Sequence, residues 1–188
     1  MPPLKDLRVG FVPYSASLQM PGDRRRFASY AQQRGIRFEL ADPRERYDVV
    51  LLSERADISL WCDYAKGKIV YDLIDSYLAI PRNDLKGQLR GLAKFLTRQH
   101  RRPRLNHWHA IEAMCRRADA VVCTTAEQKR DIEKFCSNVH IILDNHTAVT
   151  RQIKTDYRAG AVFQLVWEGL PATLDSLLLI KDALRAFG

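Results

Sequence analysis

Residues 68–74 read KIVYDLI, and residues 118–124 read ADAVVCT. Each stretch is a short apolar run, rich in Val and Ile, that ends in polar residues, which is the pattern of a buried strand. Four similar runs lie at residues 7–14, 36–40, 47–52 and 139–143, and helix-like segments alternate with them. Apolar strands that alternate with helices indicate a parallel sheet that is covered on both faces. The sequence therefore predicts an α/β, Rossmann-like fold with helices on both faces of a parallel sheet.

The composition is that of a globular protein. The chain has 188 residues, of which 46% are hydrophobic and 28% charged, which argues against disorder, collagen and a coiled coil. Its longest apolar runs are too short to span a bilayer, and its first ten residues lack the apolar region of a signal peptide. We therefore expect a cytoplasmic protein, either free or held peripherally at the inner face of the membrane.

The segment between the fourth and fifth predicted strands is long and basic. Residues 82–117 contain ten Lys or Arg and two acidic residues, which accounts for the whole formal charge of +8. We expect two helices here, at about 84–100 and 105–117. In the first helix, leucines at 85, 89, 92 and 96 form one stripe that would pack on the domain. A second stripe would face outward, either as a solvated surface or as an anion- or membrane-binding surface: Lys86, Arg90, Lys94 and Arg98.

The last part of the chain starts a new pattern. Residues 163–167 read FQLVW as a buried strand, a turn follows, and residues 173–187 predict a helix. One strand and one helix cannot bury both faces of the strand. We expect residues 1–147 to form the first domain, 148–160 a linker, and 161–188 the first strand-helix unit of a truncated second domain. The alternative is that this strand extends the edge of the first sheet.

The order of these elements, together with four short strings, resembles the GT-B fold glycosyltransferases of the glycosyl transferase group 1 type. The strings are VYDLID at 70–75, ADAVVCTT at 118–125, IILDNHT at 141–147 and VWEGLP at 166–171. The resemblance implies an N-terminal, acceptor-side domain followed by the start of a donor-side domain. It also implies transfer of a sugar from a nucleotide-sugar to an acceptor hydroxyl, in the synthesis of cell-surface glycans.

The same resemblance sets expectations for partners and cofactors. The partners would be a nucleotide-sugar donor, held mainly by residues beyond these 188, and a glycan or lipid-linked acceptor. We expect no cofactor and no bound metal, and we expect the 188-residue chain alone to be inactive. The exposed second unit would favour a homodimer, because exchange of this unit between two chains would bury its apolar surface.

Two groups of residues are candidates for binding phosphate. Gly22, Arg24 and Arg25 follow the first strand, where ligands of open α/β sheets bind. Asp23 would cap the helix that follows, through about residue 34. The alternative is a solvated arginine cluster. The resemblance implies that Gly169 lets the backbone approach the donor phosphates; the alternative is a plain turn glycine.

Asp72 and Asp75 are the candidate catalytic residues, because they lie at the end of the fourth strand. A carboxylate there could accept a proton from an acceptor hydroxyl, although Asp75 could instead cap the next turn. Four further candidates lie at other strand ends: Tyr14, Glu54, Thr124 and Glu127. The histidines show no metal-ligand spacing.

The rival function is a non-enzymatic, Rossmann-like module that binds an anionic polymer through the basic segment. A nucleic-acid surface would interleave aromatic residues with basic ones. Within this segment the aromatic residues are Phe95 and Trp108, and Phe95 lies beside the leucine stripe. This sparse aromatic content argues against nucleic acid as the polymer.

Overall fold

The computed structural model describes residues 6–80, 93–98, 100–101, 106–146, 150, 152, 155–156, 158, 160 and 174–186. The chain divides into two compact units, Met1–Val149 and Thr150–Gly188.

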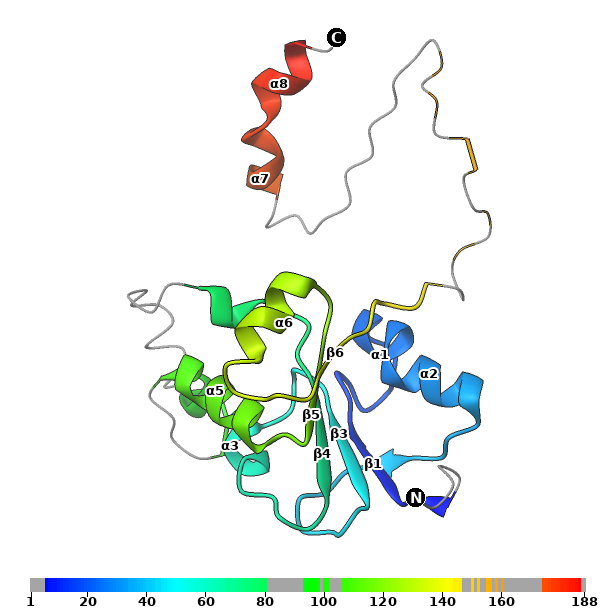
Figure 1. Cartoon of the computed structure of the whole chain (residues 1–188), viewed down its shortest axis with the longest axis vertical. Coiled ribbons are helices and arrows are strands. Elements are labelled where there is room, and N and C mark those ends of the chain that lie inside the picture. Colours follow the sequence, from blue (N-terminus) through cyan, green and yellow to red (C-terminus); the bar gives the residue numbers. More distant parts are fainter. Residues whose placement is uncertain are drawn as a thin grey trace. The chain divides into compact units, whose positions relative to one another are not determined.

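The first unit is built on a six-stranded sheet in the order β2-β1-β3-β4-β5-β6 (Figure 1). The strands are β1 (Val9–Val12), β2 (Glu39–Leu40), β3 (Val49–Leu52), β4 (Lys68–Asp72), β5 (Ala120–Cys123) and β6 (Val139–Ile141). Every neighbouring pair is parallel. The predicted α/β fold with a parallel sheet is therefore confirmed, and each of the six runs singled out in the sequence contains a strand.

One face of the sheet carries the main core. Alternate residues of the central strands point into it and are almost fully buried: Val50, Leu52, Ile69, Tyr71, Val121 and Cys123. The helices α3 (Ile58–Trp61), α5 (His107–Arg117) and α6 (Ala126–Ile132) cover this face. Side chains from these helices, such as Trp61, Met114 and Ile132, complete the cluster.

The opposite face carries α1 (Pro21–Arg25) and α2 (Phe27–Arg34). Phe11 of β1 packs edge-on against Phe27 and Phe38, with ring centroids 4.9 and 5.4 Å away. The sequence predicted one helix capped by Asp23, and this prediction is wrong. The helix starts at Pro21 and breaks at Arg26, whose backbone leaves helical geometry at φ −119° and ψ −129°.

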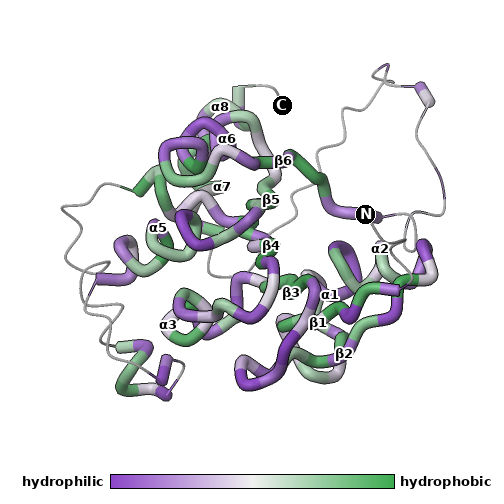
Figure 2. Tube along the Cα trace, turned by 60° about the horizontal axis from the view of Figure 1, so that its bottom comes forward, coloured by the Kyte–Doolittle hydropathy of each residue, from purple (hydrophilic) through white to green (hydrophobic). Residues whose placement is uncertain are grey.

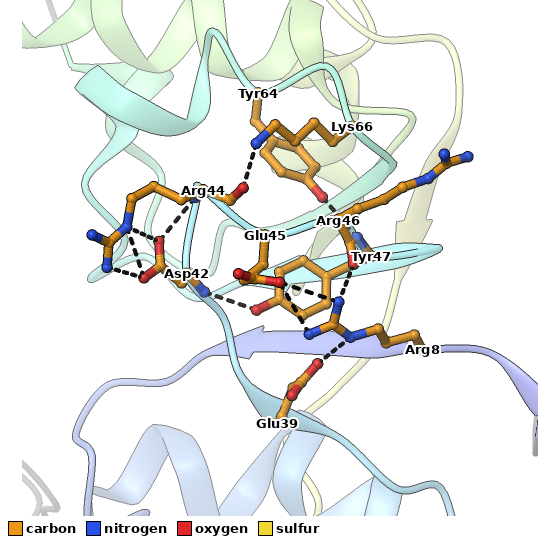
Figure 3. A network of polar contacts seen from close by, with 9 residues as sticks. All are labelled: Arg8, Glu39, Asp42, Arg44, Glu45, Arg46, Tyr47, Tyr64 and Lys66. Carbon is orange, nitrogen blue, oxygen red and sulfur yellow. Dashed lines mark hydrogen bonds and ion pairs between the residues drawn. The ribbon is translucent and has the colours of Figure 1, made fainter.

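At the amino ends of the strands, a polar network fixes the positions of β1, β2 and β3 (Figure 3). The Arg8 guanidinium donates to Glu39 at 2.6 Å and to the carbonyl of Arg46 at 2.9 Å. The amide of Tyr47 donates to the Tyr64 hydroxyl at 3.0 Å, and Lys66 donates to the Arg44 carbonyl. Because these bonds join segments on either side of the strands, they oppose a slip in strand register.

The basic segment is described in part. Residues 93–96 are helical, and α5 begins where Asn106 accepts hydrogen bonds from the amides of Trp108 and His109. The leucine stripe was expected to pack on the domain throughout, but Leu96 is 71% exposed. The prediction is wrong at this position, where the helical residues end and a turn follows at residues 97–98.

In the second unit, the described residues form the short helices α7 (Leu174–Leu178) and α8 (Lys181–Ala186). Leu178, Leu179 and Ile180 are at least half exposed. The predicted helix at 173–187 is thus two helices separated by a turn at residues 179–180. The predicted strand at 163–167 lies outside the described residues, so a second domain stays a prediction.

Candidate carboxyl-edge site

The strand order places a topological switch point between β1 and β3. β1 is followed in sequence by β2 on one side, and β3 lies on its other side. In open parallel sheets, the loops that leave the carboxyl ends of strands at such a point diverge and leave a crevice for a ligand. The residues that follow β1, β3 and β4 are therefore the first place to look for a functional site.

The loop after β1 is held in place by a buried carboxylate. Asp23 is fully buried and accepts hydrogen bonds from the amides of Tyr14 and Ser15 at 2.8 and 3.1 Å. The ring of Tyr14 lies directly against Gly22, where an added Cβ would be 2.5 Å from a ring carbon. Asp23 and Gly22 therefore set the position of Tyr14, a role that the sequence did not indicate for either residue.

Arg26 joins three segments through a buried ion pair. Its guanidinium makes a two-pronged contact with Asp72 at 2.7 and 2.6 Å, and a third nitrogen donates to Asp144 at 2.9 Å. The side chains of Arg26 and Asp72 are 4% and 6% exposed. Burial opposes the charge on Arg26, but the hydrogen bonds that Arg26 donates to Asp72 and Asp144 outweigh this effect and raise the pKa of the guanidinium.

Glu54, two residues after the end of β3, has a different environment. Its Oε2 atom is buried and has no hydrogen-bond partner among the described residues. Burial is the main reason that the pKa of Glu54 is raised, and the nearby Asp75 carboxylate adds to it. A hydrogen bond from Tyr77 opposes this rise. Glu54 is thus a carboxyl group with one buried, unpartnered oxygen and an increased affinity for a proton.

The Tyr14 hydroxyl lies in the same region. It is buried and has no partner of good geometry within the described part of the chain. Burial, followed by the negative charges of Asp72 and Glu54, raises the pKa of Tyr14, so the phenol stays protonated at neutral pH. The carboxyl ends of three adjacent strands thus bring together a neutral hydroxyl and a proton-accepting carboxyl group. We call Tyr14, Glu54, Asp75 and Tyr77 the carboxyl-edge cluster.

The residues predicted from the sequence are distributed as follows. Asp72 lies next to this cluster but uses both oxygens on Arg26, whereas Asp75 is exposed beside Glu54. Arg24 is exposed, and Arg25 lies 3.7 Å from Asp144. The Thr124 hydroxyl bonds to Gln128, and Glu127 pairs with Arg130. A phosphate near Gly22, Arg24 and Arg25 stays a prediction.

Of the four basic residues in the predicted outward-facing stripe, the structure describes Lys94 and Arg98. Lys94 turns inward, with its Nζ 3.3 Å from Nε2 of the buried His107, and Arg98 is exposed. The expectation that Lys94 faces outward is therefore wrong, because the start of α5 offers it a partner. Lys86, Arg90 and Gly169 lie outside the described residues.

A hollow of about 790 Å³ opens at the carboxyl ends of β1 and β2. Arginine and aspartate side chains are evenly mixed in its lining: Asp42, Arg44, Asp57, Asp63, Arg98 and Arg101. Arg44 donates hydrogen bonds to both oxygens of Asp42 and lowers the pKa of that carboxyl group to about 2. Because the charges offset one another, the hollow has no excess of cations to attract an anion.

Metal and membrane features are absent from the part of the chain that is described. No group of three His, Cys, Asp or Glu side chains among these residues has the arrangement of a metal site. None of the helices in the described ranges combines the length and hydropathy needed to cross a bilayer. Comparison of the chain with protein-family models, with curated proteins and with solved structures gave no match.

Proposed function

We propose that the first unit is the acceptor-side domain of a GT-B fold glycosyltransferase, and that Glu54 accepts the proton of the acceptor hydroxyl. The observation that supports this most is the buried, unpartnered Oε2 of Glu54 at the switch point of a parallel sheet. The four strings that resemble this enzyme class support the choice of reaction.

The proposed step is a single group transfer. The acceptor oxygen forms a bond to the anomeric carbon of the sugar, and the bond from that carbon to the phosphate oxygen breaks. The nucleoside diphosphate leaves with the electron pair, and the acceptor proton passes to Glu54. A raised pKa suits this role, because a general base works best when its pKa lies near the working pH.

We place the base at Glu54 and not at Asp72, because the two oxygens of Asp72 accept hydrogen bonds from Arg26. Arg26 and Asp72 would instead hold the ends of β4 and β6 in position. Asp75 would keep the proton affinity of Glu54 high, and the protonated Tyr14 would donate a hydrogen bond to the acceptor.

The test is an assay of nucleoside diphosphate release with a panel of nucleotide-sugars and acceptor alcohols. The protein is the product of the complete reading frame that contains these residues, and the 188-residue chain is assayed beside it. We expect turnover by the former and none by the latter. Glu54→Gln should lower kcat by about 10²–10⁴-fold, the usual share of a general base.

The matched control is Glu133→Gln, which removes an exposed carboxylate of the same type near the end of α6. It should leave kcat unchanged. Wild-type kcat should also fall on the acidic side of a pH profile, as Glu54 becomes protonated, and this limb should be absent in Glu54→Gln. Equal turnover of the two variants would overturn the assignment of Glu54. Failure of the protein to turn over any nucleotide-sugar in the panel would overturn the proposed reaction.

A further inference from the structure

A groove with a volume of about 410 Å³ runs along the α2 face of the sheet. This volume is within the range of small-molecule pockets, roughly 300–1,000 Å³. Its floor is made by side chains from three central strands: Val49, Leu51, Val70 and Val122. One wall includes Phe27 and Tyr30 of α2, and the other includes Ile142 and Leu143, which follow β6.

The groove exists because of the strand order. The chain passes from β3 to β6 in one direction across the sheet, and the helices described on that path, α3, α5 and α6, lie on the other face. Within the described residues of the first unit, α1 and α2 cover only the β1 side of this face. In Figure 2 the central strands and the segment after β6 are coloured as hydrophobic. The apolar surface is therefore both concave and accessible.

The walls of the groove are more exposed than its floor. Ile142 is 53% exposed, Leu143 71% and Tyr30 47%. Exposed apolar surface that gathers in one place is unfavourable in water, and it marks sites for apolar ligands or partners. A ligand that lies along the groove would cover the floor and both walls together.

One end of the groove is polar. Arg26 and Asp72 line it there as a closed ion pair, so they add little net charge. Arg25 lines the same end, its side chain is 35% exposed, and its nearest recorded acidic atom is Asp144 Oδ2 at 3.7 Å. That distance is beyond a hydrogen bond. The groove thus combines a long apolar floor with an arginine at one end, whose charge Asp144 offsets in part but whose guanidinium keeps N–H donors for an anionic ligand.

We propose that this groove binds a single-chain amphiphile, with its hydrocarbon chain along the floor and an anionic head group, a carboxylate or a phosphate, at Arg25. Charge complementarity at Arg25 and the almost wholly apolar lining carry the choice of ligand. The inference goes beyond the proposed transfer reaction and is independent of it, because binding is measured without a nucleotide-sugar.

The experiment is calorimetric titration of the 188-residue chain with lauric acid, monododecyl phosphate and dodecanol, each below its aggregation concentration. We expect both anionic ligands to bind with one site, and dodecanol to bind about tenfold more weakly. The ratio of the two anionic affinities tells whether carboxylate or phosphate is preferred. Arg25→Gln should weaken lauric acid binding about tenfold and leave dodecanol binding unchanged.

Substitutions that fill the groove test the contribution of its apolar floor to binding separately from that of Arg25. Val122→Phe, and independently Val70→Phe, should weaken the binding of all three ligands at least tenfold, because the larger ring occupies the space of the chain. Thermal unfolding of each variant shows that it is folded. Arg130→Gln is the matched control for charge, since it removes an arginine of α6 that does not line the groove.

The proposal is overturned if neither anionic ligand binds, if both filled variants bind as wild type does, or if Arg25→Gln behaves as Arg130→Gln does. The proposal is also overturned if wild type does not bind lauric acid and forms a dimer in sedimentation that Val122→Phe dissociates. That result would assign the groove to a second copy of the chain.

Discussion

At the scale of single residues, the carboxyl ends of the strands show two opposite uses of a carboxylate. Asp72 is ion-paired with Arg26, which donates a hydrogen bond to each of its two oxygens. Glu54 keeps an unpartnered oxygen and a raised pKa. Burial raises the pKa of both carboxyl groups, so the difference between them lies in the hydrogen bonds that Arg26 donates to Asp72.

The first prediction concerns Arg26. Arg26→Met would leave the Asp72 carboxylate buried without its partner, so we expect a loss of about 3–5 kcal/mol in the free energy of unfolding. Urea denaturation measures this loss. Arg24→Met, a change of the same kind at an exposed position of α1, should stay within about 0.5 kcal/mol of wild type. Similar losses in the two variants would mean that the Arg26–Asp72 ion pair contributes little to the free energy of unfolding.

The second prediction is the effect of pH on stability through Glu54. Its pKa is raised in the folded state, so between its ordinary value near 4.5 and the raised value the folded chain binds more protons than the unfolded chain. The contribution of Glu54 is therefore fully favourable below pH 4.5 and is lost as the pH rises through the folded pKa. Glu54→Gln removes this dependence.

The measurement is the difference in unfolding free energy between Glu54→Gln and wild type across the pH range. The variant should gain on wild type as the pH rises through that window, and the difference should then be constant. A difference that moves in the other direction would show that the folded state lowers the pKa of Glu54.

At the scale of elements, close approach and backbone conformation fix where strands and helices begin and end. Gly67 precedes β4, and an added Cβ there would lie 1.9 Å from the Tyr47 carbonyl oxygen. Gly35 ends α2 with a left-handed φ of 63°, and no atom lies within 4 Å of an added Cβ. One glycine is required by a neighbouring backbone, and the other by its own conformation.

The third prediction follows from this contrast. Gly67→Ala must displace the backbone that leads into β3, so it should cost about 3 kcal/mol or more. Gly35→Ala forces an alanine into the left-handed conformation, which should lower the free energy of unfolding by about 1 kcal/mol. Chemical denaturation of both variants gives the comparison. The packing argument fails if Gly67→Ala is the milder of the two.

Element patterns explain how much was predictable. The six strands follow from local apolar runs such as 68–74 and 118–124, because a strand buried on both sides needs apolar residues throughout. The break at Arg26 was not predictable, since no Pro or Gly marks it and the partners of its side chain, Asp72 and Asp144, lie 46 and 118 positions away. Glu54 was named as a candidate only by its place at a strand end. Its unpartnered oxygen depends on Tyr77 and Asp75, which local patterns cannot position.

At the scale of the whole molecule, the described part of the second unit keeps its apolar residues at the surface. Leu178, Leu179 and Ile180 are 56%, 87% and 50% exposed. Two helices of five and six residues are too short to be stable in water without packing against another surface. A surface of this kind favours association.

The fourth prediction is therefore self-association that depends on this unit. Sedimentation of the chain should show a dimer, and Leu178→Gln/Leu179→Gln/Ile180→Gln should shift it toward monomer. Leu96→Gln is the matched control, because Leu96 is a 71% exposed leucine of the first unit. The idea is wrong if the triple variant and the control associate equally.

The contacts of Arg26 with Asp72 and Asp144 also affect the order in which the chain folds during synthesis. Every strand pairing in the sheet is parallel, so none can form as a local hairpin, and each waits for a complete crossover to be made. Arg26 meets Asp144, 118 residues later, only after β6 has left the ribosome. Until then its guanidinium has Asp72 as its carboxylate partner, and α1 lacks the contacts that Asp144 and Asn145 make with Arg25. Nascent chains halted before residue 144 should therefore resist proteolysis less at α1 and α2 than chains halted well after it.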